Sequence, residues 1–238
     1  MKYAKELNAL QDASLDAVSA ARDQIELQFS EHAKEENRVD NTLKRLFAYL
    51  SDRSQAVSYL VSSNFVWDAE IVLRSFYEAN AKIWYICLNE PAQRETLVEE
   101  FWGPYASMHN HKRARRAAPA VDLSIRHNRT ADAVIFSTLA DRTIFNTGEG
   151  NKNDRKALEQ KWSFTEIIRF ISNNSPKDFD LRDAPGLLHM YGQQSHLIHA
   201  DESALDLMLD RRLRAPEELE VLACAHACRI ISDQAGLW

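Results

Sequence analysis

Glycine and proline are scarce in this chain of 238 residues, and both are missing from its first ninety. The first proline is Pro91 and the first glycine is Gly103. Because these two residues interrupt helices most often, their absence favours long helices. Apolar residues from Leu7 to Phe29 recur at intervals of three, four or seven, which predicts one long amphipathic helix over residues 3–35.

Cysteine is also rare, and no long apolar run is present. Cys87, Cys224 and Cys228 are too few for a disulfide framework and are interpreted as reduced core residues. No segment approaches the roughly 18 apolar residues of a membrane-spanning helix. The N-terminus lacks the basic segment and apolar stretch of a secretory signal. We therefore expect a cytoplasmic protein without a membrane partner.

The composition is that of an ordinary folded protein, with 45% hydrophobic and 27% charged residues. One hydrophobic core can still serve a chain of this length, so a single domain is expected. The net charge of -6 argues against a surface that attracts nucleic acid everywhere. Any nucleic-acid site must therefore be a local patch.

Helical periodicity and helix-end signals predict an all-α fold, a single-domain helical bundle of seven to nine helices with a long N-terminal helix. Residues 1–60 are expected to form a helical hairpin or arm packed on a core domain of residues 61–238. After the first helix, further helices are predicted near residues 40–60, 64–88, 91–116, 131–141, 163–174, 185–199 and 216–235, with loops over 117–130 and 147–154.

Several residues mark where these helices should end or bend. Asp40 is the expected N-cap of the second helix. Gly103 and Pro104 predict a break or kink. Ser163 and Glu166 have the spacing of a capping box, Asp183 and Pro185 open the helix that ends near His199, and Gly236 is the expected C-terminal glycine of the last helix.

The helix predicted over 64–88 is apolar over a wide arc, which is typical of a central helix. Its remaining side carries Trp67, Glu70, Arg74, Glu78, Ala81 and Tyr85 at helical spacing. Arg74 and Glu78 are an i,i+4 pair of opposite charge. They form either an exposed pair worth a few tenths of a kcal/mol or a buried pair that needs further hydrogen bonds.

The helix predicted over 185–199 carries an unusual group of histidines. Leu188, Gly192, Ser195 and His199 fall on one line, with His189 and His196 beside it and Tyr191 on the other flank. Glycine inside a helix costs roughly 1 kcal/mol, so Gly192 indicates that a backbone or a ligand comes close there. Alternatively, His199 is a core histidine and the other two lie on the surface.

Three segments together resemble a broad bacterial family of helical domains of unknown function. They are VLRSFYEANAKIWYI at 72–86, KWSFTEIIRFI at 161–171 and MYGQQSHLIHADES at 190–203, and the resemblance covers about residues 60–205. The family pattern carries over to Arg74, Glu78, Trp162, Ser163, Tyr191, Ser195 and His199. It implies that the two polar helix faces meet in one buried cluster.

A basic segment stands out against the acidic composition. Residues 109–116 read HNHKRARR, and further cations follow. The expected nucleic-acid or anion-binding residues are Lys112, Arg113, Arg115, Arg116, Arg126 and Arg129. Trp102 and Tyr105 could stack a base or serve packing. The alternative is a solvated face paired with Glu95, Glu99 and Glu100 or with a partner subunit.

A distant resemblance to the HEPN helical proteins implies an RNA- or nucleotide-processing effector of a bacterial toxin or phage-defence system. Such an enzyme would be a metal-independent ribonuclease without a cofactor. Arg182 and His189, with six residues between them, have the spacing of the HEPN motif. In a dispersed version the expected catalytic residues are Arg74, Glu78, Tyr191, Ser195 and His199. His199 would act as general acid or base, Arg74 would stabilise phosphate charge and Glu78 would orient it.

Two other classes of function stay open. The chain fits a non-catalytic helical module that binds a protein partner or a small anion. It also fits a metal-binding bundle that would use Glu78, His189, His196 and His199. The apolar edge of the N-terminal helix predicts a homodimer, although a bundle within one chain would use the same edge.

Overall fold

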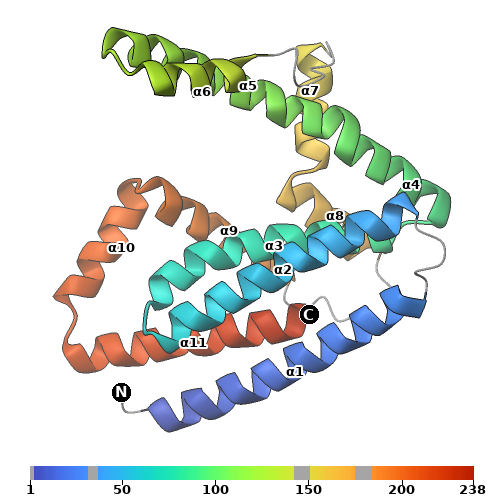
Figure 1. Cartoon of the computed structure of the whole chain (residues 1–238). Helices are drawn as coiled ribbons and strands as arrows, with labels where there is room; N and C mark the ends of the chain where they lie inside the picture. The colour runs from blue at the N-terminus through green and yellow to red at the C-terminus, as the bar shows by residue number, and fades with distance from the viewer. Residues whose placement is uncertain (1–2, 32–36, 142–150, 175–183) are drawn as a thin grey trace. The chain divides into compact units, whose positions relative to one another are not determined.

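The protein is all-helical in the computed structural model, which describes residues 3–31, 37–141, 151–174 and 184–238 (Figure 1). The described residues contain no strand, so the predicted all-α class is confirmed. They form ten continuous helical segments, because α4, η1 and α5 run into one another, and the prediction of seven to nine was too low. The elements are α1 (Ala4–Glu31), α2 (Arg38–Ser62), α3 (Val66–Cys87), α4 (Pro91–Glu100), the π-helical η1 (Phe101–Tyr105), α5 (Ala106–Arg126), α6 (Thr130–Ala140), α7 (Lys152–Lys161), α8 (Phe164–Asn174), α9 (Ala184–His199), α10 (Glu202–Leu213) and α11 (Pro216–Leu237).

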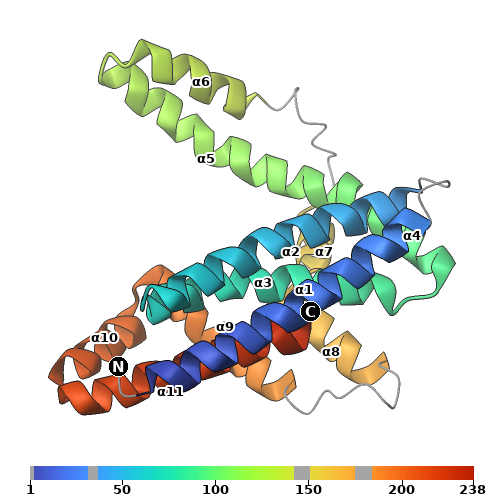
Figure 2. The ribbon, with the colours of Figure 1, turned by 60° about the horizontal axis from the view of Figure 1, so that its bottom comes forward.

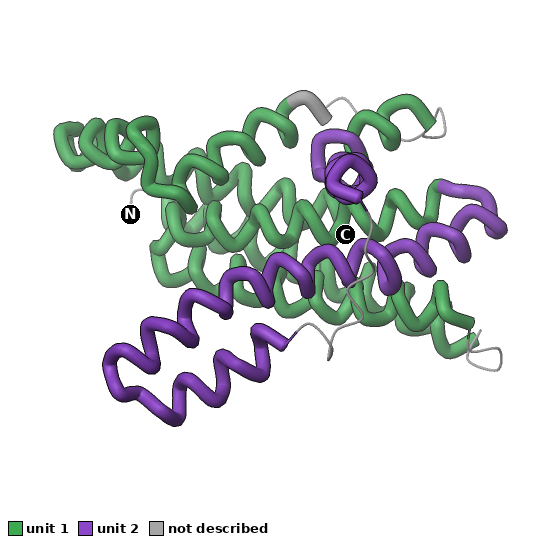
Figure 3. Tube along the Cα trace, turned by 90° about the horizontal axis from the view of Figure 1, so that it is seen from above, with its two compact units in different colours: residues 1–88, 167–238 green, residues 89–166 purple. Residues whose placement is uncertain are grey.

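The chain divides into two compact units (Figure 3). Unit 1 comprises Met1–Leu88 and Ile167–Trp238, and unit 2 comprises Asn89–Glu166. The boundary expected near residue 60 is not one of these divisions, because α1 and α2 share a unit with α3 and α11. Among the described helices, none has the length and apolar character that a membrane crossing demands.

Helix α3 is the central helix of unit 1, as its wide apolar arc predicted. It packs against α2, α9 and α11. Leu73, Phe76 and Ile86 on α3 are fully buried. Burying a side chain of this size stabilises the fold by roughly 1.5–3 kcal/mol. The polar face of α3 is therefore held in place by the apolar faces beside it.

Helix α1 runs along α11 (Figure 2). Leu7 and Val18 on its inner edge are buried, and Ser14 Oγ donates a hydrogen bond of 3.4 Å to the carbonyl of Ile231. The apolar edge of the N-terminal helix is thus used within one chain. The homodimer stays a prediction.

Some helix ends differ from those expected. Asn37 caps α2, and its side chain accepts a hydrogen bond from the backbone N–H of Asp40, so Asp40 is not the cap. Ser163 caps α8 as predicted by accepting from the Glu166 N–H. Gly236 lies inside α11 rather than beyond it, and the expected cap Asp183 lies outside the described residues. The helix α10 was missed because its apolar residues do not gather on one face.

The loop predicted over residues 117–130 was wrong. Helix α5 continues through Pro119 to Arg126 and is followed by α6, which agrees with the helix predicted at 131–141. Ala114 and Ala117 are buried on α5, which packs along α6. The alanines around the proline favour helix strongly enough to offset its missing N–H.

The cysteines are free, as expected, but Cys87 is exposed and is not a core residue. Cys224 and Cys228 are half-buried on α11. Burial and the neighbouring Cys228 raise the pKa of the Cys224 thiol. The Cys224 thiol is therefore a poor nucleophile near neutral pH.

Candidate functional site

Arg74 and Glu78 form the expected ion pair on α3, and Tyr191 on α9 joins it. Arg74 Nε lies 3.4 Å from Glu78 Oε1, and the guanidinium stacks 4.0 Å from the centre of the Tyr191 ring. The Tyr191 hydroxyl accepts from Arg74 Nη2 and donates to Glu78 Oε1, each at 2.8 Å. Burial, then the hydrogen bond to Glu78 and its charge, raises the pKa of Tyr191 to about 12. Three of the five predicted catalytic residues thus meet in a half-buried cluster.

Ser195 and His199 are not part of this cluster. Neither shares a hydrogen bond or an ion pair with Arg74, Glu78 or Tyr191, and His199 is exposed at the last turn of α9. It lies eight residues after Tyr191, or about 12 Å along the helix. Among the described residues, no hydrogen bond or ion pair therefore joins His199 to Arg74, as the predicted cluster required.

No backbone comes close to Gly192 among the described residues, because a Cβ built there would meet no heavy atom within 4 Å; the alternative of a ligand stays a prediction. His196 Nδ1 bonds to Asp201 Oδ2 at the start of α10, and His189 is exposed. Within the described ranges, no three histidine, cysteine, aspartate or glutamate side chains gather as metal ligands. The set of Glu78, His189, His196 and His199 is therefore not assembled there.

Two substitutions on α9 compare how much the half-buried Tyr191 and the exposed His199 contribute to stability. We expect Tyr191→Phe to lower the free energy of unfolding by about 0.5–1.5 kcal/mol, because Arg74 and Glu78 each lose a hydrogen bond. His199→Ala should change it by less than about 0.5 kcal/mol, because an exposed side chain without contacts is lost. Urea unfolding followed by circular dichroism measures both, and a larger loss for His199→Ala would contradict this assignment.

A second, more deeply buried polar cluster centres on Glu70, one turn before Arg74 on α3. Its side chain is 2% exposed. Arg229 Nη2 and His226 Nδ1, both on α11, bond to Glu70 Oε1, the latter at 2.9 Å. Gln194 Nε2 on α9 donates to Oε2 at 3.2 Å. Both carboxylate oxygens are thus engaged by side chains from two other helices, α9 and α11.

The same cluster continues to Tyr77 and Asp233. Arg229 Nη1 donates to Asp233 Oδ2 at 2.5 Å and to the Tyr77 hydroxyl at 3.1 Å, and Tyr77 donates to Asp233 at 2.5 Å. Two carboxylates therefore share one guanidinium. The cluster is a hydrogen-bonded network that joins α3, α9 and α11.

The pKa values follow from this arrangement. Burial alone would raise the pKa of Glu70, but the hydrogen bond from His226 and the charge of Arg229 hold it below its ordinary value. Burial raises the pKa of Asp233, which shares the same arginine. Burial and the charge of Asp233 also raise the pKa of Tyr77. Glu70 is therefore held in its ionised form, with hydrogen bonds to both carboxylate oxygens.

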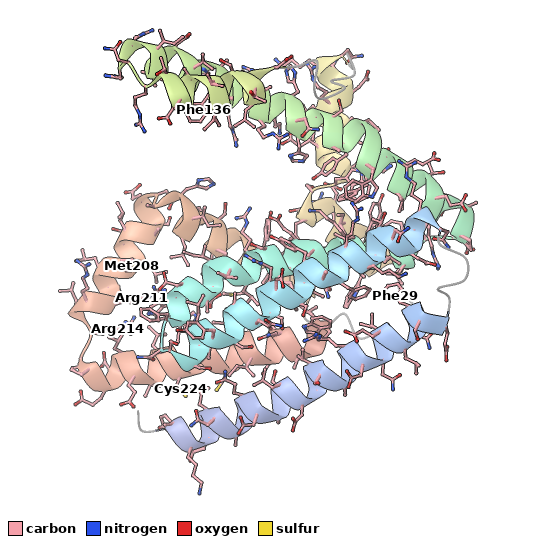
Figure 4. All side chains as sticks on the ribbon, in the orientation of Figure 1. Phe29, Phe136, Met208, Arg211, Arg214 and Cys224 are labelled. Atoms are coloured by element: carbon pink, nitrogen blue, oxygen red, sulfur yellow. The ribbon has the colours of Figure 1, made fainter. Side chains whose placement is uncertain are left out.

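Arg211, labelled in Figure 4, is a buried side chain on α10. Its guanidinium carbon lies 3.2 Å from the centre of the Trp67 ring, and that ring meets the His226 ring at 4.5 Å. Burial lowers the pKa of Arg211 to about 10. At neutral pH the residue still carries its charge and compensates the surplus carboxylate of Glu70 and Asp233.

The sequence interpretation missed His226, Arg229 and Asp233. They stand at intervals of three and four residues in an otherwise apolar terminal helix. Three polar residues on one line of such a helix indicate a partner for the polar face of α3, and this signal was available.

Unit 2 contains a basic groove of about 320 Å³ between α5 and α7. It is lined by Met108, His111, Lys112 and Arg115 from α5 and by Lys152, Arg155, Lys156 and Glu159 from α7. Its one carboxylate, Glu159, is paired with Lys112. Arg115, Lys152, Arg155 and Lys156 have no ion-pair partner among the described residues. We call these eight residues the basic groove.

The groove exists because residues 152–161 form a helix, α7, that was not predicted. The segment 147–154 was predicted as a loop, but Asn151 caps a helix that starts at Lys152. Its side chain accepts from the N–H groups of Asn153 and Asp154 at 2.8 and 3.0 Å. Residues 147–150 lie outside the described residues. Lys152, Arg155 and Lys156 then share one helix face, a spacing that was visible in the sequence.

The Lys-Trp-Ser segment anchors α7 within unit 2. Trp162 is 2% exposed, and its ring packs 5.3 Å from Phe101 and 5.4 Å from Tyr105. Trp162 Nε1 donates to Glu100 Oε1 at 2.7 Å, and Lys161 Nζ lies 2.7 Å from the same oxygen. Glu100 therefore pairs with Lys161 and not, as one alternative supposed, with the cations of α5.

The predicted basic residues do not form one patch. Lys112 and Arg115 line the basic groove, whereas Arg113 and Arg116 are exposed elsewhere on α5. Arg126, at the end of α5, is fourteen residues beyond Lys112, or about 21 Å along the helix. Arg129 pairs with Asp132 at 2.6 Å.

Comparison with protein-family models, with curated proteins and with solved structures found no match to this chain. The chemistry of the site therefore carries the functional argument alone. A groove with four cations that lack an ion-pair partner among the described residues offers electrostatic attraction and hydrogen-bond donors to an anion.

Proposed function

We propose that this protein binds nucleic acid through the basic groove of unit 2. The observation that carries the proposal is the excess of cations in that groove, five against one carboxylate. Lysine and arginine at helical spacing on two facing helices suit the repeated charges of a phosphate backbone. A small monovalent anion would need only one or two of them.

The charge distribution supports the same proposal. Residues 89–166 carry 12 of the 29 basic and 11 of the 35 acidic residues, which gives unit 2 a net charge of +1 and leaves -7 for the rest of the chain. The acidic residues of unit 1 repel a polyanion and favour its approach to unit 2. A local basic site in an acidic protein is thus consistent with selective rather than general attraction.

Cleavage of the bound strand, as the HEPN resemblance implies, receives no support from the geometry. Arg74, Glu78 and Tyr191 bond to one another, and His199 lies apart from them. Arg182 of the HEPN-like pair lies outside the described residues. We therefore assign binding to the protein and no reaction.

The triple variant Lys152→Gln/Arg155→Gln/Lys156→Gln tests the proposal. We expect its affinity for a labelled RNA to fall at least about tenfold, which corresponds to ~1.4 kcal/mol. The salt dependence should also weaken by about 2 in the slope of log K against log salt, because three contacts of about 0.7 each are lost. Fluorescence anisotropy over a salt series measures both quantities.

A matched control removes the same charge from unit 1. The variant Lys5→Gln/Arg38→Gln/Arg212→Gln changes three exposed side chains and should bind like the natural protein. Equal losses for the two triple variants would refute a localised site. Equally tight binding of polyglutamate would instead assign the groove to an acidic protein partner and overturn the proposal.

A further inference from the structure

Aromatic rings continue the basic groove along α5 and η1. His109 precedes the groove residue Lys112 by one helical turn. The His109 ring lies 4.6 Å from that of Tyr105, which stacks 5.7 Å from Phe101. The Phe101 ring in turn lies 5.2 Å from Trp102. A continuous row of ring contacts thus leads from the groove to Trp102, and we call these four rings the aromatic row.

Trp102 ends this row with an accessible indole. It is 40% exposed, an unusual state for the largest apolar side chain. It lies in the π-helical turn that contains Pro104, and a Cβ built at Gly103 would meet nothing within 4 Å. The space beside the Gly103 backbone is therefore open.

The row and the groove together are long enough for more than one nucleotide. Ten residues separate Trp102 from Lys112, which is about 15 Å along a helix. The core of the row is rigid, because Phe101 and Tyr105 are both fixed against the buried Trp162. Rigid, partly exposed rings next to cations are the arrangement in which bases stack while phosphates are neutralised.

Base stacking allows a protein to discriminate single strands from duplexes. In a duplex each base is covered by its neighbours above and below, so an external ring cannot reach its face. In a single strand the faces are available, and every base can use them. We propose that unit 2 binds single-stranded nucleic acid, with phosphates in the basic groove and a base stacked on Trp102. This inference rests on the proposed function and specifies its substrate class.

Four labelled probes of about 12 nucleotides test the inference by fluorescence anisotropy on the full chain. They are single-stranded RNA, single-stranded DNA, the RNA duplex of the same length, and a single strand whose central residues lack bases. We expect both base-bearing single strands to bind at least about tenfold tighter than the duplex at the same salt concentration. RNA and DNA strands are expected to differ little, because stacking and phosphate contacts are common to both.

Trp102→Ala should weaken binding of the base-bearing single strands by about 5-fold to 100-fold, the range for losing one stacked base. It should leave the salt slope and the affinity for the abasic strand unchanged. Trp102→Phe, which keeps a stacking ring, should restore most of the lost affinity. Should Trp102→Ala fail to fold, as judged by circular dichroism, His109→Ala replaces it with the same expectations.

The outcomes separate the inference from the proposed function. Equal binding of duplex and single strand, both weakened by the Lys152, Arg155 and Lys156 variant, would keep the proposed function and overturn the single-strand preference. An equal effect of Trp102→Ala on the abasic strand would overturn base stacking. Absence of salt-dependent binding to all four probes would overturn both.

Discussion

Arg229→Met is expected to lower the free energy of unfolding by about 3–5 kcal/mol, the cost of removing one partner of a buried ion pair. The substitution keeps most of the side-chain volume but removes the cation that Glu70 and Asp233 share. It leaves a fully buried carboxylate with only His226 and Gln194 as hydrogen-bond partners. Urea unfolding at neutral pH, followed by circular dichroism, measures the loss.

The pH dependence of the free energy of unfolding tests the role of Arg229 in a second way. In the natural protein the pKa of Glu70 is lowered, so its stabilising contribution is present above the ordinary value of 4.5 and is lost as the pH falls through the folded-state pKa. Without Arg229 the pKa of Glu70 should rise instead, because burial is no longer opposed by a neighbouring charge. The difference in stability between Arg229→Met and the natural protein should therefore shrink between pH 7 and pH 4.

Arg22→Met is the matched control. Arg22 lies on the surface of α1, 3.9 Å from Glu26, and an exposed pair of this kind contributes about 0–1 kcal/mol. Equal stability losses for the two arginine variants, or a loss for Arg229→Met that does not vary with pH, would contradict the role assigned to the Glu70 cluster.

Periodicity predicted which residues share a helix face, but not what lies opposite that face. The pair of Arg74 and Glu78 was recognised because both partners stand on one helix. Tyr191 was placed on the correct helix, but the register of α9 against α3 brings Tyr191 and Gln194 to the polar face instead of His199. Register between helices depends on how their side chains interlock, which a single sequence does not display.

The two loop predictions that proved wrong in part have a common physical cause. Pro119 and the arginine run suggested a break in α5, and the glycines near residue 150 suggested that Lys152 belongs to a loop. In both cases a local helix breaker was given more weight than the alanines or the asparagine cap beside it. The cations of α7 were consequently left out of the basic patch, although they share a face in the sequence.

Trp162→Ala is expected to affect unit 2 as strongly as Arg229→Met affects unit 1. Removing a buried tryptophan costs about 3–5 kcal/mol through lost contacts and the cavity left behind. Because Trp162 joins the end of α7 to Phe101 and Tyr105, its loss should also release α7 from α5 and abolish the basic groove.

The expected result for Trp162→Ala is therefore a double one, a lower unfolding free energy and an RNA affinity as weak as that of the Lys152, Arg155 and Lys156 variant. Trp162→Phe separates packing from hydrogen bonding: it keeps a ring between Phe101 and Tyr105 and loses only the bond to Glu100, at about 0.5–1.5 kcal/mol. It should retain RNA binding, because Lys161 still pairs with Glu100 and holds the end of α7. A Trp162→Ala protein that is folded and destabilised but keeps full RNA affinity would contradict this expectation. It would show that the cations bind RNA without the fixed spacing of α5 and α7.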